Sequence, residues 1–521
     1  MSKRFYITTA IDYVNGQPHL GHAYEKIVTD VIARSRRAMG DEVFFLTGLD
    51  EHGQKVQQAA QKTGQSPQAY CDGLATDWKN FVARIQLTQD DFIRTTEPRH
   101  KVVVQAILAK LHAGGHFYKA QHHGWYSSRE ETFLTEKDRL PDGSFDATWG
   151  EVIELAEDNY YFKLKAHQPW LLSYIEAHPE FIAPAQHRNA VLGFLKNNTL
   201  EDLCITRPAS RLNWGIPLPF DPAFVTYVWF DALVNYISGP ASCGDPAVCG
   251  ALDLQPPAAT RAPILWPADV HVLGKDILKF HAVYWPIMLK AMGLSLPAKL
   301  LVHGWWQKDG AKISKATGNI VEPLAIIDEW GVDAFRYHVV RELEVGADGN
   351  WTDAGFAARY HADLANGLGN LVNRSLSMLK RYRNGILQGP SNELAADATR
   401  VATTATEQLR SFQLQSALET IWSLVTRANQ YVDQTAPFKL AKDPAQASRL
   451  DEVLYNLAET CRILAVLLFP FMPGTSGKIY AQLGISSAPD QLSLAAWGGL
   501  AAGHAVGEPA PLFPRKDIPP K

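Results

Sequence analysis

The chain opens with three stretches that decide its fold: Phe5-Tyr6-Ile7-Thr8-Thr9-Ala10, Pro18-His19-Leu20-Gly21-His22 and Val43-Phe44-Phe45-Leu46-Thr47. The outer two are short apolar runs, which are typical of buried strands. Between them, from His19 onward, apolar residues recur at helical spacing: Leu20, Ala23, Ile27 and Val31. A strand, a helix and a second strand in this order predict a βαβ unit, whose sheet is parallel by default.

The same pattern returns late in the chain. Residues 270–274 and 299–303 are predicted strands, and a helix that includes Ile277, Phe280 and Tyr284 is predicted between them. Residues 116–225 alternate strand-like pieces with turns, which predicts an α+β insertion within this α/β domain. After Trp351, apolar residues at helical spacing predict an all-α bundle, with amphipathic segments near 400–432 and 450–469 and a leucine stripe at Leu364, Leu368, Leu371 and Leu379.

The composition is that of a globular protein of several domains. Of 521 residues, 46% are hydrophobic and 20% are charged, and 50 Lys and Arg against 54 Asp and Glu leave a net charge of −4. This balance excludes a globally basic surface, so contact with nucleic acid must come from a local patch. The five cysteines form no CxxC pair, which argues against a disulfide framework and a cysteine-rich zinc site.

Nothing in the sequence indicates a membrane span or an export signal. The longest apolar run, 463–469, is far shorter than the roughly 20 residues that span a bilayer, and Pro470 ends it. The N-terminus enters a strand pattern at once and lacks signal-peptide character. We therefore expect a cytoplasmic protein that does not associate with membranes.

The first chemical motif is His19-Leu20-Gly21-His22, at the predicted change from strand to helix. A helix N-terminus presents free N–H groups and a positive dipole end, which suit a phosphate. The two histidines share one helical face, and Gly21 would let a nucleotide approach the backbone. Taken alone, the motif is equally consistent with capping or surface histidines. A zinc site is less favoured, because there is no HExxH.

The second motif is Lys312-Ile313-Ser314-Lys315, in a glycine-containing loop after the last predicted strand. Two lysines on a mobile loop can meet a polyphosphate whose charge grows as a bond breaks. The alternative is an ordinary solvated loop. No GxGxxG is present, and neither Gly274-Lys275 nor Gly477-Lys478 precedes Ser or Thr, which argues against a dinucleotide dehydrogenase and a P-loop kinase.

In this order, the two motifs resemble those of class I aminoacyl-tRNA synthetases. Four further blocks are similar to the methionyl-tRNA synthetase family, and the resemblance runs from residue 5 to Phe513: residues 10–16, 47–53, 227–232 and 274–281. It implies a Rossmann-like catalytic domain that activates L-methionine with ATP and Mg²⁺ and charges initiator and elongator methionine tRNA. The expected parts are a catalytic domain in two halves (1–115 and 226–320), the insertion (116–225), a stem-contact linker (321–352) and an anticodon-binding bundle (353–521).

The resemblance assigns residues to the reacting phosphates and to ATP. The expected catalytic residues are His19, His22, Lys312 and Lys315, the lysines holding the departing pyrophosphate. The expected ATP contacts are Gly21, His22, Glu25, Gly274, Asp276 and Lys315. Where the family motif ends in Ser, this chain has Ala316, so one hydroxyl is missing.

The resemblance also implies a methionine pocket. Asp50 is expected to bind the ammonium group, and the side-chain pocket is expected to comprise Ala10, Ile11, Tyr13, Trp229, Ala232, Tyr236 and His281. Three of these, Trp229, Ala232 and Tyr236, have the spacing of one helical face, and a thioether favours aromatic edges. The alternative is an aromatic stripe in the core. Leu233 stands where some family members have Pro.

In the helical half, Asn370, Arg374 and Phe438 match the residues that read the anticodon in the family, although Trp is more common than Phe at the last position. Arg374 lies in a stretch without acidic residues, 370–383, which supplies the local basic patch. Proteins read unstacked bases by hydrogen bonds to the base edges and by stacking on an aromatic side chain. For the basic residues 380–383, the alternative is a solvated helix face.

Two expectations are absences. Family members often bind zinc through cysteine pairs in the insertion, but residues 124–133 contain no cysteine, so we expect no zinc. An apolar core should replace the metal, built from Trp125, Tyr126, Phe133, Trp149, Tyr160 and Phe162. Many relatives also carry a C-terminal β-barrel that dimerises them. This chain ends soon after Phe513, so we expect a monomer.

Three other functions fit the sequence less well. A class I synthetase of the Ile/Val/Leu/Cys group would need a larger editing insertion than roughly 110 residues, or thiolate zinc ligands in the pocket. A nucleotidyltransferase with the same histidine motif would not require the helical half. A non-catalytic RNA-binding module would not require Asp50, Lys312 and Lys315.

Overall fold

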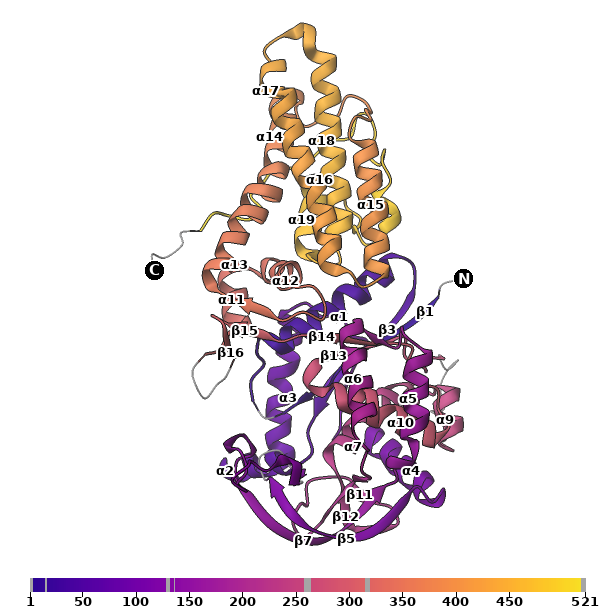
Figure 1. Ribbon diagram of the computed structural model, residues 1–521. Helices are drawn as coiled ribbons and strands as arrows, with labels where there is room; N and C mark the ends of the chain where they lie inside the picture. The colour runs from indigo at the N-terminus through magenta and orange to yellow at the C-terminus, as the bar shows by residue number, and fades with distance from the viewer. Residues whose placement is uncertain are drawn as a thin grey trace.

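The computed structural model describes residues 3–14, 16–127, 132–134, 136–256, 264–313 and 319–516. Along its length the molecule has a helical bundle at one end, a parallel sheet in the middle and a long antiparallel hairpin at the other end (Figure 1). The helix α1 (Leu20–Ala38) runs between the sheet and the bundle. Both ends of the molecule therefore adjoin the sheet domain.

The central sheet has seven strands, all parallel, in the order β2-β3-β1-β13-β14-β8, with β4 beside β3. Its strands are β1 (Arg4–Thr9), β2 (Asp12–Tyr13), β3 (Glu42–Asp50), β4 (Asp91–Arg94), β8 (Ile182–Ala183), β13 (Val270–Gly274) and β14 (Leu300–His303). The four strands and the first helix predicted from sequence are confirmed. The expected insertion also contributes β8 to this sheet. A strand of two residues is too short to be predicted from the sequence.

The two faces of the sheet carry separate cores, as alternation along a strand requires. On β1, Phe5 and Ile7 pack with α1, while Tyr6 packs with the helices on the opposite face. The helices of this domain are α2 (Gln54–Lys62), α3 (Pro67–Arg84), α4 (Pro98–Ala113), α5 (Gln168–Ala177), α6 (Ala185–Asn197), α7 (Val228–Leu233), α8 (Asn235–Ser242), α9 (Pro246–Ala251) and α10 (Trp285–Met292).

The insertion is dominated by the hairpin of β5 (Phe117–Ser127) and β7 (Val152–Phe162), paired along their whole length. It also contains β6 (Thr132–Leu134), β9 (Leu203–Cys204), β10 (Thr206–Pro208), β11 (Pro217–Leu218) and β12 (Asp221–Thr226).

The single apolar core expected in this hairpin does not form among the described side chains. Trp125 contacts Phe145, whereas Tyr160 and Phe162 pack against rings outside the hairpin, such as Phe224 and Phe230. The side chain of Phe133 lies outside the description. The long hairpin is too thin to cover a core of its own, so its base packs on the sheet domain instead.

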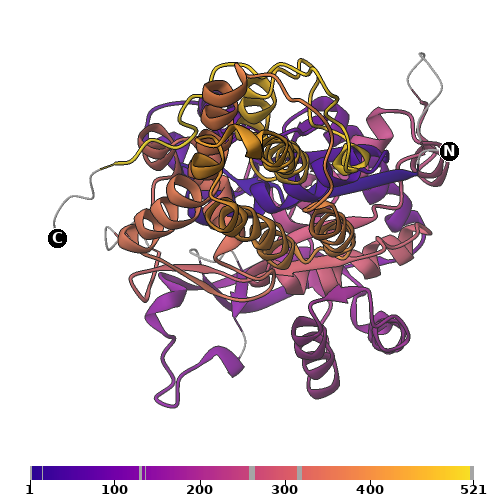
Figure 2. The same ribbon diagram turned by 90° about the horizontal axis from the view of Figure 1, so that it is seen from above.

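The C-terminal part is an all-α bundle, as predicted. Seen end-on in Figure 2, its orange and yellow helices cluster over the indigo and magenta sheet domain. The leucine stripe from Leu364 to Leu379 is buried. The helices are α13 (Asp353–Arg359), the π-helical Tyr360–Gly369, α14 (Asn370–Arg383), α15 (Ala395–Arg410), α16 (Leu414–Thr435), α17 (Pro437–Leu440), α18 (Ala447–Leu468) and α19 (Pro473–Gln482). Of the helices described, none is long and apolar enough to cross a membrane.

A buried arginine joins the two domains. It lies on α12 (Val332–Arg341), which follows α11 (Pro323–Trp330) and the strands β15 (Trp306–Lys308) and β16 (Ala311–Lys312); β15 also pairs with β17 (Gly349–Trp351). The fully buried Arg336 pairs with Asp30 on α1 at 2.7 Å and donates to the carbonyl oxygen of Phe471, between α18 and α19, at 2.9 Å. The helix that begins at the histidine motif is thus tied to the bundle.

Candidate active site

A cavity of about 690 Å³ lies at the carboxyl ends of β1, β3, β13 and β14. In an open parallel sheet, ligands bind there, where the strand order reverses around β1. The cavity brings together most of the residues expected to contact ATP and methionine: Ala10, Ile11, Tyr13, His19, Gly21, His22, Glu25, Asp50, Trp229, Ala232, Tyr236, Gly274, Asp276 and His281.

The two motif histidines cap α1, which fixes their ring hydrogens. The backbone N–H of Gly21 donates to His19 Nδ1 at 3.1 Å, and the backbone N–H of His19 donates to His22 Nδ1 at 3.2 Å. Because each Nδ1 accepts, each ring carries its hydrogen on Nε2. The rings stack with centroids 3.7 Å apart. Capping and function therefore coincide: the cap leaves two Nε2–H donors beside the positive end of the helix, which favours an anion.

Gly21 leaves room for this cap. A Cβ at this position would lie 3.0 Å from Cε1 of His19, tighter than ordinary contact. A side chain at Gly21 would therefore require the His19 ring to shift by a few tenths of an ångström.

A buried ion pair lies beneath these histidines, and the sequence did not single it out. Lys26, fully buried on α1, places its Nζ 2.5 Å from Oδ2 of Asp12. Asp12 lines the cavity, with its Oδ1 4.0 Å from His22 Nε2. Burial raises the pKa of Asp12 to about 7, against the opposing effect of Lys26. A lysine four residues after His22 on an amphipathic helix gave no sign of being buried.

The side of the cavity expected to take ATP contains a second pair, Glu25 and His303. Oε2 of Glu25 lies 3.1 Å from Nε2 of His303. Burial alone would lower the pKa of His303, but the hydrogen bond and charge of Glu25 outweigh it, so that pKa is raised. His303 was also missed, although it ends a predicted parallel strand, where ligand-binding residues gather.

Gly274 and Asp276 follow β13 at the same end of the sheet. A Cβ at Gly274 would lie 2.5 Å from Oδ1 of Asp276, so only glycine lets this carboxylate fold back. The half-exposed indole of Trp305, a further residue that the sequence did not indicate, donates to Asp276 Oδ1 at 3.2 Å. This side of the cavity thus combines a carboxylate with an aromatic ring.

The side of the cavity expected to take methionine is formed by Asp50, at the end of β3, and by α7 and α8. Trp229, Ala232 and Tyr236 have the spacing of one helical face, and the structure places them on two short helices separated by Val234, which itself has a helical backbone conformation. The three side chains line one cavity.

Aromatic and imidazole groups of this side are held in place by neighbours. The Trp229 ring stacks on Phe280 with centroids 3.7 Å apart. Nδ1 of His281 lies 3.0 Å from the carbonyl oxygen of Ile277, so Nδ1 carries the hydrogen and Nε2 accepts from the Tyr236 hydroxyl at 2.7 Å. Burial lowers the pKa of His281, which favours this neutral form.

The lysine motif is described only in part. The backbone of Lys312 ends β16, and Ile313 lines the cavity, so the loop begins there. The side chain of Lys312 lies outside the description, as do Lys315 and Ala316.

The three residues expected to read the anticodon lie on the bundle, away from this cavity. Asn370 and Arg374 are on α14, where Arg374 Nη2 lies 3.4 Å from Asp433 Oδ1 on α16. Phe438, with 45% of its surface exposed, lies on α17 at the end of the bundle farthest from the sheet (Figure 1).

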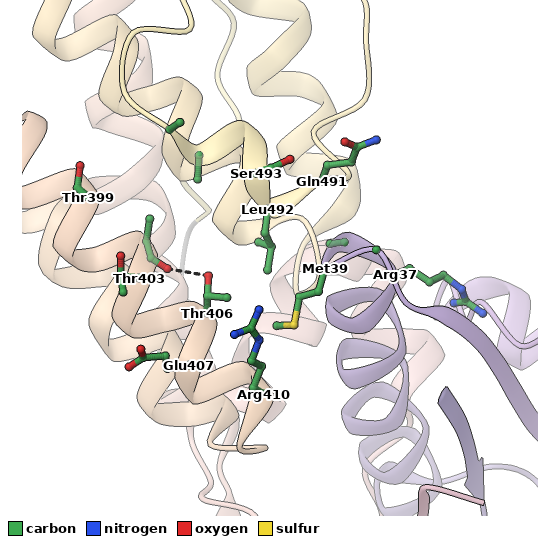
Figure 3. Close-up of a pocket in the computed structure, with 15 residues that line it drawn as sticks. Arg37, Met39, Thr399, Thr403, Thr406, Glu407, Arg410, Gln491, Leu492 and Ser493 are labelled. Carbon is green, nitrogen blue, oxygen red and sulfur yellow. Dashed lines mark hydrogen bonds between the residues drawn. The ribbon is translucent and has the colours of Figure 1, made fainter. Parts of the chain in front are cut away.

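A second cavity, of about 680 Å³, lies between the end of α1, α15 and the segment 491–496 (Figure 3). Arg410, Thr406 and Met39 point into it, but none of the expected site residues lines it. Among the described residues, no three His, Cys, Asp or Glu side chains are placed to hold a metal ion.

The parallel sheet, the first helix capped by two histidines and the all-α bundle that follows agree with a class I aminoacyl-tRNA synthetase, and comparison with family models shows this class. The family model described as "tRNA synthetases class I (M)" matches residues 5–143 and 147–376, and the one described as "Anticodon binding domain of methionyl tRNA ligase" matches residues 384–517. The chain belongs to the methionyl-tRNA synthetase family, and its reaction is the ligation of methionine to tRNA.

Relatives extend this likeness over the whole chain. The methionine–tRNA ligase of Caldanaerobacter subterraneus is 42% identical over 99% of this chain and 80% of its own length. That of Bacillus subtilis is 40% identical over 98% and 78%. A solved structure of Mycobacterium tuberculosis methionyl-tRNA synthetase in complex with methionyl-adenylate has a TM-score of 0.90 and 39% identity, covering 98% of this chain and 100% of that one.

Proposed function

We propose that this chain activates L-methionine with ATP in the 690 Å³ cavity and then charges both initiator and elongator methionine tRNA. The observation that carries the proposal is the meeting of Asp50 with the two capping histidines in that one cavity. A carboxylate for an ammonium group and two N–H donors for a phosphate then face one reaction centre.

In the first step, a methionine carboxylate oxygen attacks the α-phosphorus of ATP. The new O–P bond forms as the bond to the β-phosphate breaks, and pyrophosphate leaves. His19 and His22 donate through Nε2–H to phosphate oxygens, and Lys312 and Lys315 hold the pyrophosphate. No covalent nucleophile is needed, so positioning and charge stabilisation supply the catalysis.

ATP contacts are proposed at Gly21, Glu25, Gly274 and Asp276, with Trp305 as an added aromatic edge. This is supported by their common position at the carboxyl end of the sheet. Mg²⁺ neutralises phosphate charge when it is bound. Because Mg²⁺ keeps several waters and usually takes only one or two protein carboxylates besides substrate phosphates, we propose that ATP brings it on its own phosphates.

Methionine selectivity is proposed to come from the side opposite the nucleotide. Asp50 pairs with the ammonium group, while an apolar and aromatic pocket takes the thioether: Ala10, Ile11, Tyr13, Trp229, Ala232, Tyr236 and His281. Sulfur packs favourably at aromatic edges, which such a set offers. The locked, neutral His281 adds no charge that would favour an acidic or basic side chain.

In the second step, a ribose hydroxyl of the terminal tRNA adenosine attacks the methionyl carbonyl carbon, and AMP leaves. We propose that the bundle, residues 353–521, reads the anticodon through Asn370, Arg374 and Phe438. Residues 321–352 are proposed to form the linker that contacts the tRNA stem. A cytoplasmic location is supported by the five free cysteines. The monomeric state stays a prediction, for which sedimentation should give a mass near 57.7 kDa.

Methionine-dependent ATP–pyrophosphate exchange tests the proposal. We expect exchange with methionine and far less with isoleucine, leucine, valine or cysteine. Lys315→Ala should lower the exchange rate strongly while methionine binding stays nearly intact, because the lysine acts on charge that develops in the transition state. Exchange without methionine preference would refute the proposed substrate, and lost methionine binding in Lys315→Ala would refute the role of that lysine.

A further inference from the structure

Behind the methionine side of the cavity lies a buried acid held between two histidines. Asp231 on α7 and His100 on α4 are fully buried, and His52, just after β3, is 2% exposed. None of the three lines the cavity. The reaction proposed above assigns no role to this cluster. Burying a carboxylate is nevertheless costly unless hydrogen bonds or opposite charges compensate for the lost hydration.

The compensation is specific. Nδ1 of His52 lies 2.6 Å from one oxygen of Asp231, and Nε2 of His100 lies 2.7 Å from the other. Burial raises the pKa of Asp231, yet the charge and hydrogen bonds of the two histidines outweigh it and bring that pKa to about 2. Asp231 is therefore ionised at neutral pH, and each of its oxygens accepts from a different element of the fold.

Two of the three elements, the turn after β3 and α7, build the side of the cavity proposed for methionine, and the third, α4, contributes no lining residue. His52 comes two residues after Asp50, and Trp214 also holds this turn, its indole Nε1 donating to the carbonyl oxygen of Glu51 at 2.5 Å. Asp231 lies between Trp229 and Ala232 on α7, and its bond to His100 links α7 to α4; both helices are labelled in the lower half of Figure 1.

Asp231 thus joins the Asp50 turn and α7 to the same rigid helix, α4. We propose that Asp231 is a positioning residue for methionine, which with His52 and His100 sets the separation between Asp50 and the α7 wall. This inference rests on the proposed assignment of Asp50, Trp229 and Ala232 to the methionine subsite. It predicts an effect on methionine affinity from a side chain that does not touch methionine.

Asp231→Asn is the central test. The amide has one acceptor oxygen, so only one histidine can still donate to it; the other must move its ring hydrogen to its second nitrogen to accept from the NH₂ group, and both links lose the carboxylate charge. Since small misplacements in a binding site cost up to about 100-fold, we expect the KM for methionine to rise roughly 10- to 100-fold. The KM for ATP and the rate at saturating methionine should change less than about threefold, because α1 and the nucleotide side keep their contacts.

Asp245→Asn is the matched control. Asp245 is also a fully buried aspartate of this domain, but it caps α9 and accepts from the backbone N–H groups of Leu265 and Trp266. Its loss should lower the melting temperature without changing the KM for methionine. If both aspartate variants lose active protein alike with methionine KM unchanged, Asp231 is merely structural and the inference is wrong.

A pair of variants on α4 guards against misfolding of Asp231→Asn. His100→Leu removes the donor to Asp231, whereas His100→Gln keeps an N–H donor there; we expect calorimetric L-methionine affinity to fall in the first and largely return in the second. Equal affinities in the two would overturn the inference. These outcomes can be told apart from failure of the proposed function. In that case the unaltered enzyme itself would show no methionine-dependent exchange.

Discussion

Asp12 and Lys26 show how one residue pair can connect stability with the site. Both are buried beneath the histidines. Among the described ion pairs, Lys26 has only Asp12 as a partner, and Asp12 has one further partner, His22, whose Nε2 lies 4.0 Å away. Buried pairs gain little overall, but removal of one partner leaves an uncompensated charge. The folded-state pKa of Asp12, about 7, lies above its usual value, so its contribution to stability is complete below about pH 4 and is lost as the pH rises through 7.

A double-mutant cycle at pH 8 should reveal this coupling. Asp12→Asn and Lys26→Met should each destabilise the catalytic domain, by about 3–5 kcal/mol for a buried unpaired charge, and the double variant should recover much of that loss. Thermal unfolding of the four proteins measures it. Additive losses would mean that the two side chains do not depend on each other.

At the scale of the element, α1 combines a structural cap with the catalytic role proposed for His19. His19 is the N-cap residue, and Asn is at least as good a cap. His19→Ala should therefore cost about 1 kcal/mol of stability, which His19→Asn should restore. Both variants should lose exchange activity, by about 100-fold or more for a lost transition-state donor. If His19→Asn regained the rate together with the stability, His19 would be a cap only.

The elements that sequence could predict are those whose signal is local. The apolar runs of β1, β3, β13 and β14 and the periodicity of α1 are contained in a few consecutive residues. The strands β8, β15 and β17 are two or three residues long and are defined by partners far along the chain. In the site, the family resemblance supplied the cavity-lining residues, but buried Lys26 and Asp231 escaped because charged side chains are expected at the surface.

The prediction that the protein holds no zinc concerns the β5–β7 hairpin. Ser127 follows Trp125-Tyr126, where the family resemblance implies the first cysteine ligand, and serine does not deprotonate as a thiol does at neutral pH. We expect elemental analysis of the purified protein to find no stoichiometric zinc, and activity to survive chelation once Mg²⁺ is restored. Close to one tightly held zinc per chain would contradict this.

At the scale of the whole molecule, α12 clamps the reaction domain to the bundle. Arg336 donates hydrogen bonds to Asp30 of α1 and to the carbonyl oxygens of Ile85, Pro470 and Phe471. The sheet domain and the bundle therefore share one buried guanidinium group. This arrangement fixes the direction in which the bundle leaves the sheet. The residues proposed to read the anticodon can therefore act only through the tRNA that bridges both parts, not by contact with the cavity.

This separation makes Arg374→Ala selective. The variant should lose aminoacylation roughly 10- to 100-fold, since a hydrogen bond to or from a charged group contributes about 1.5–3 kcal/mol, while methionine-dependent ATP–pyrophosphate exchange stays unchanged. Arg381→Ala, on the exposed end of the same helix, is the matched control: it should alter neither assay if residues 380–383 form a solvated helix face rather than part of the basic patch that meets tRNA. A tRNA with one anticodon base changed should be charged poorly by the unaltered enzyme and no worse by Arg374→Ala. Equal losses in both assays would instead show that Arg374 supports the fold of the bundle.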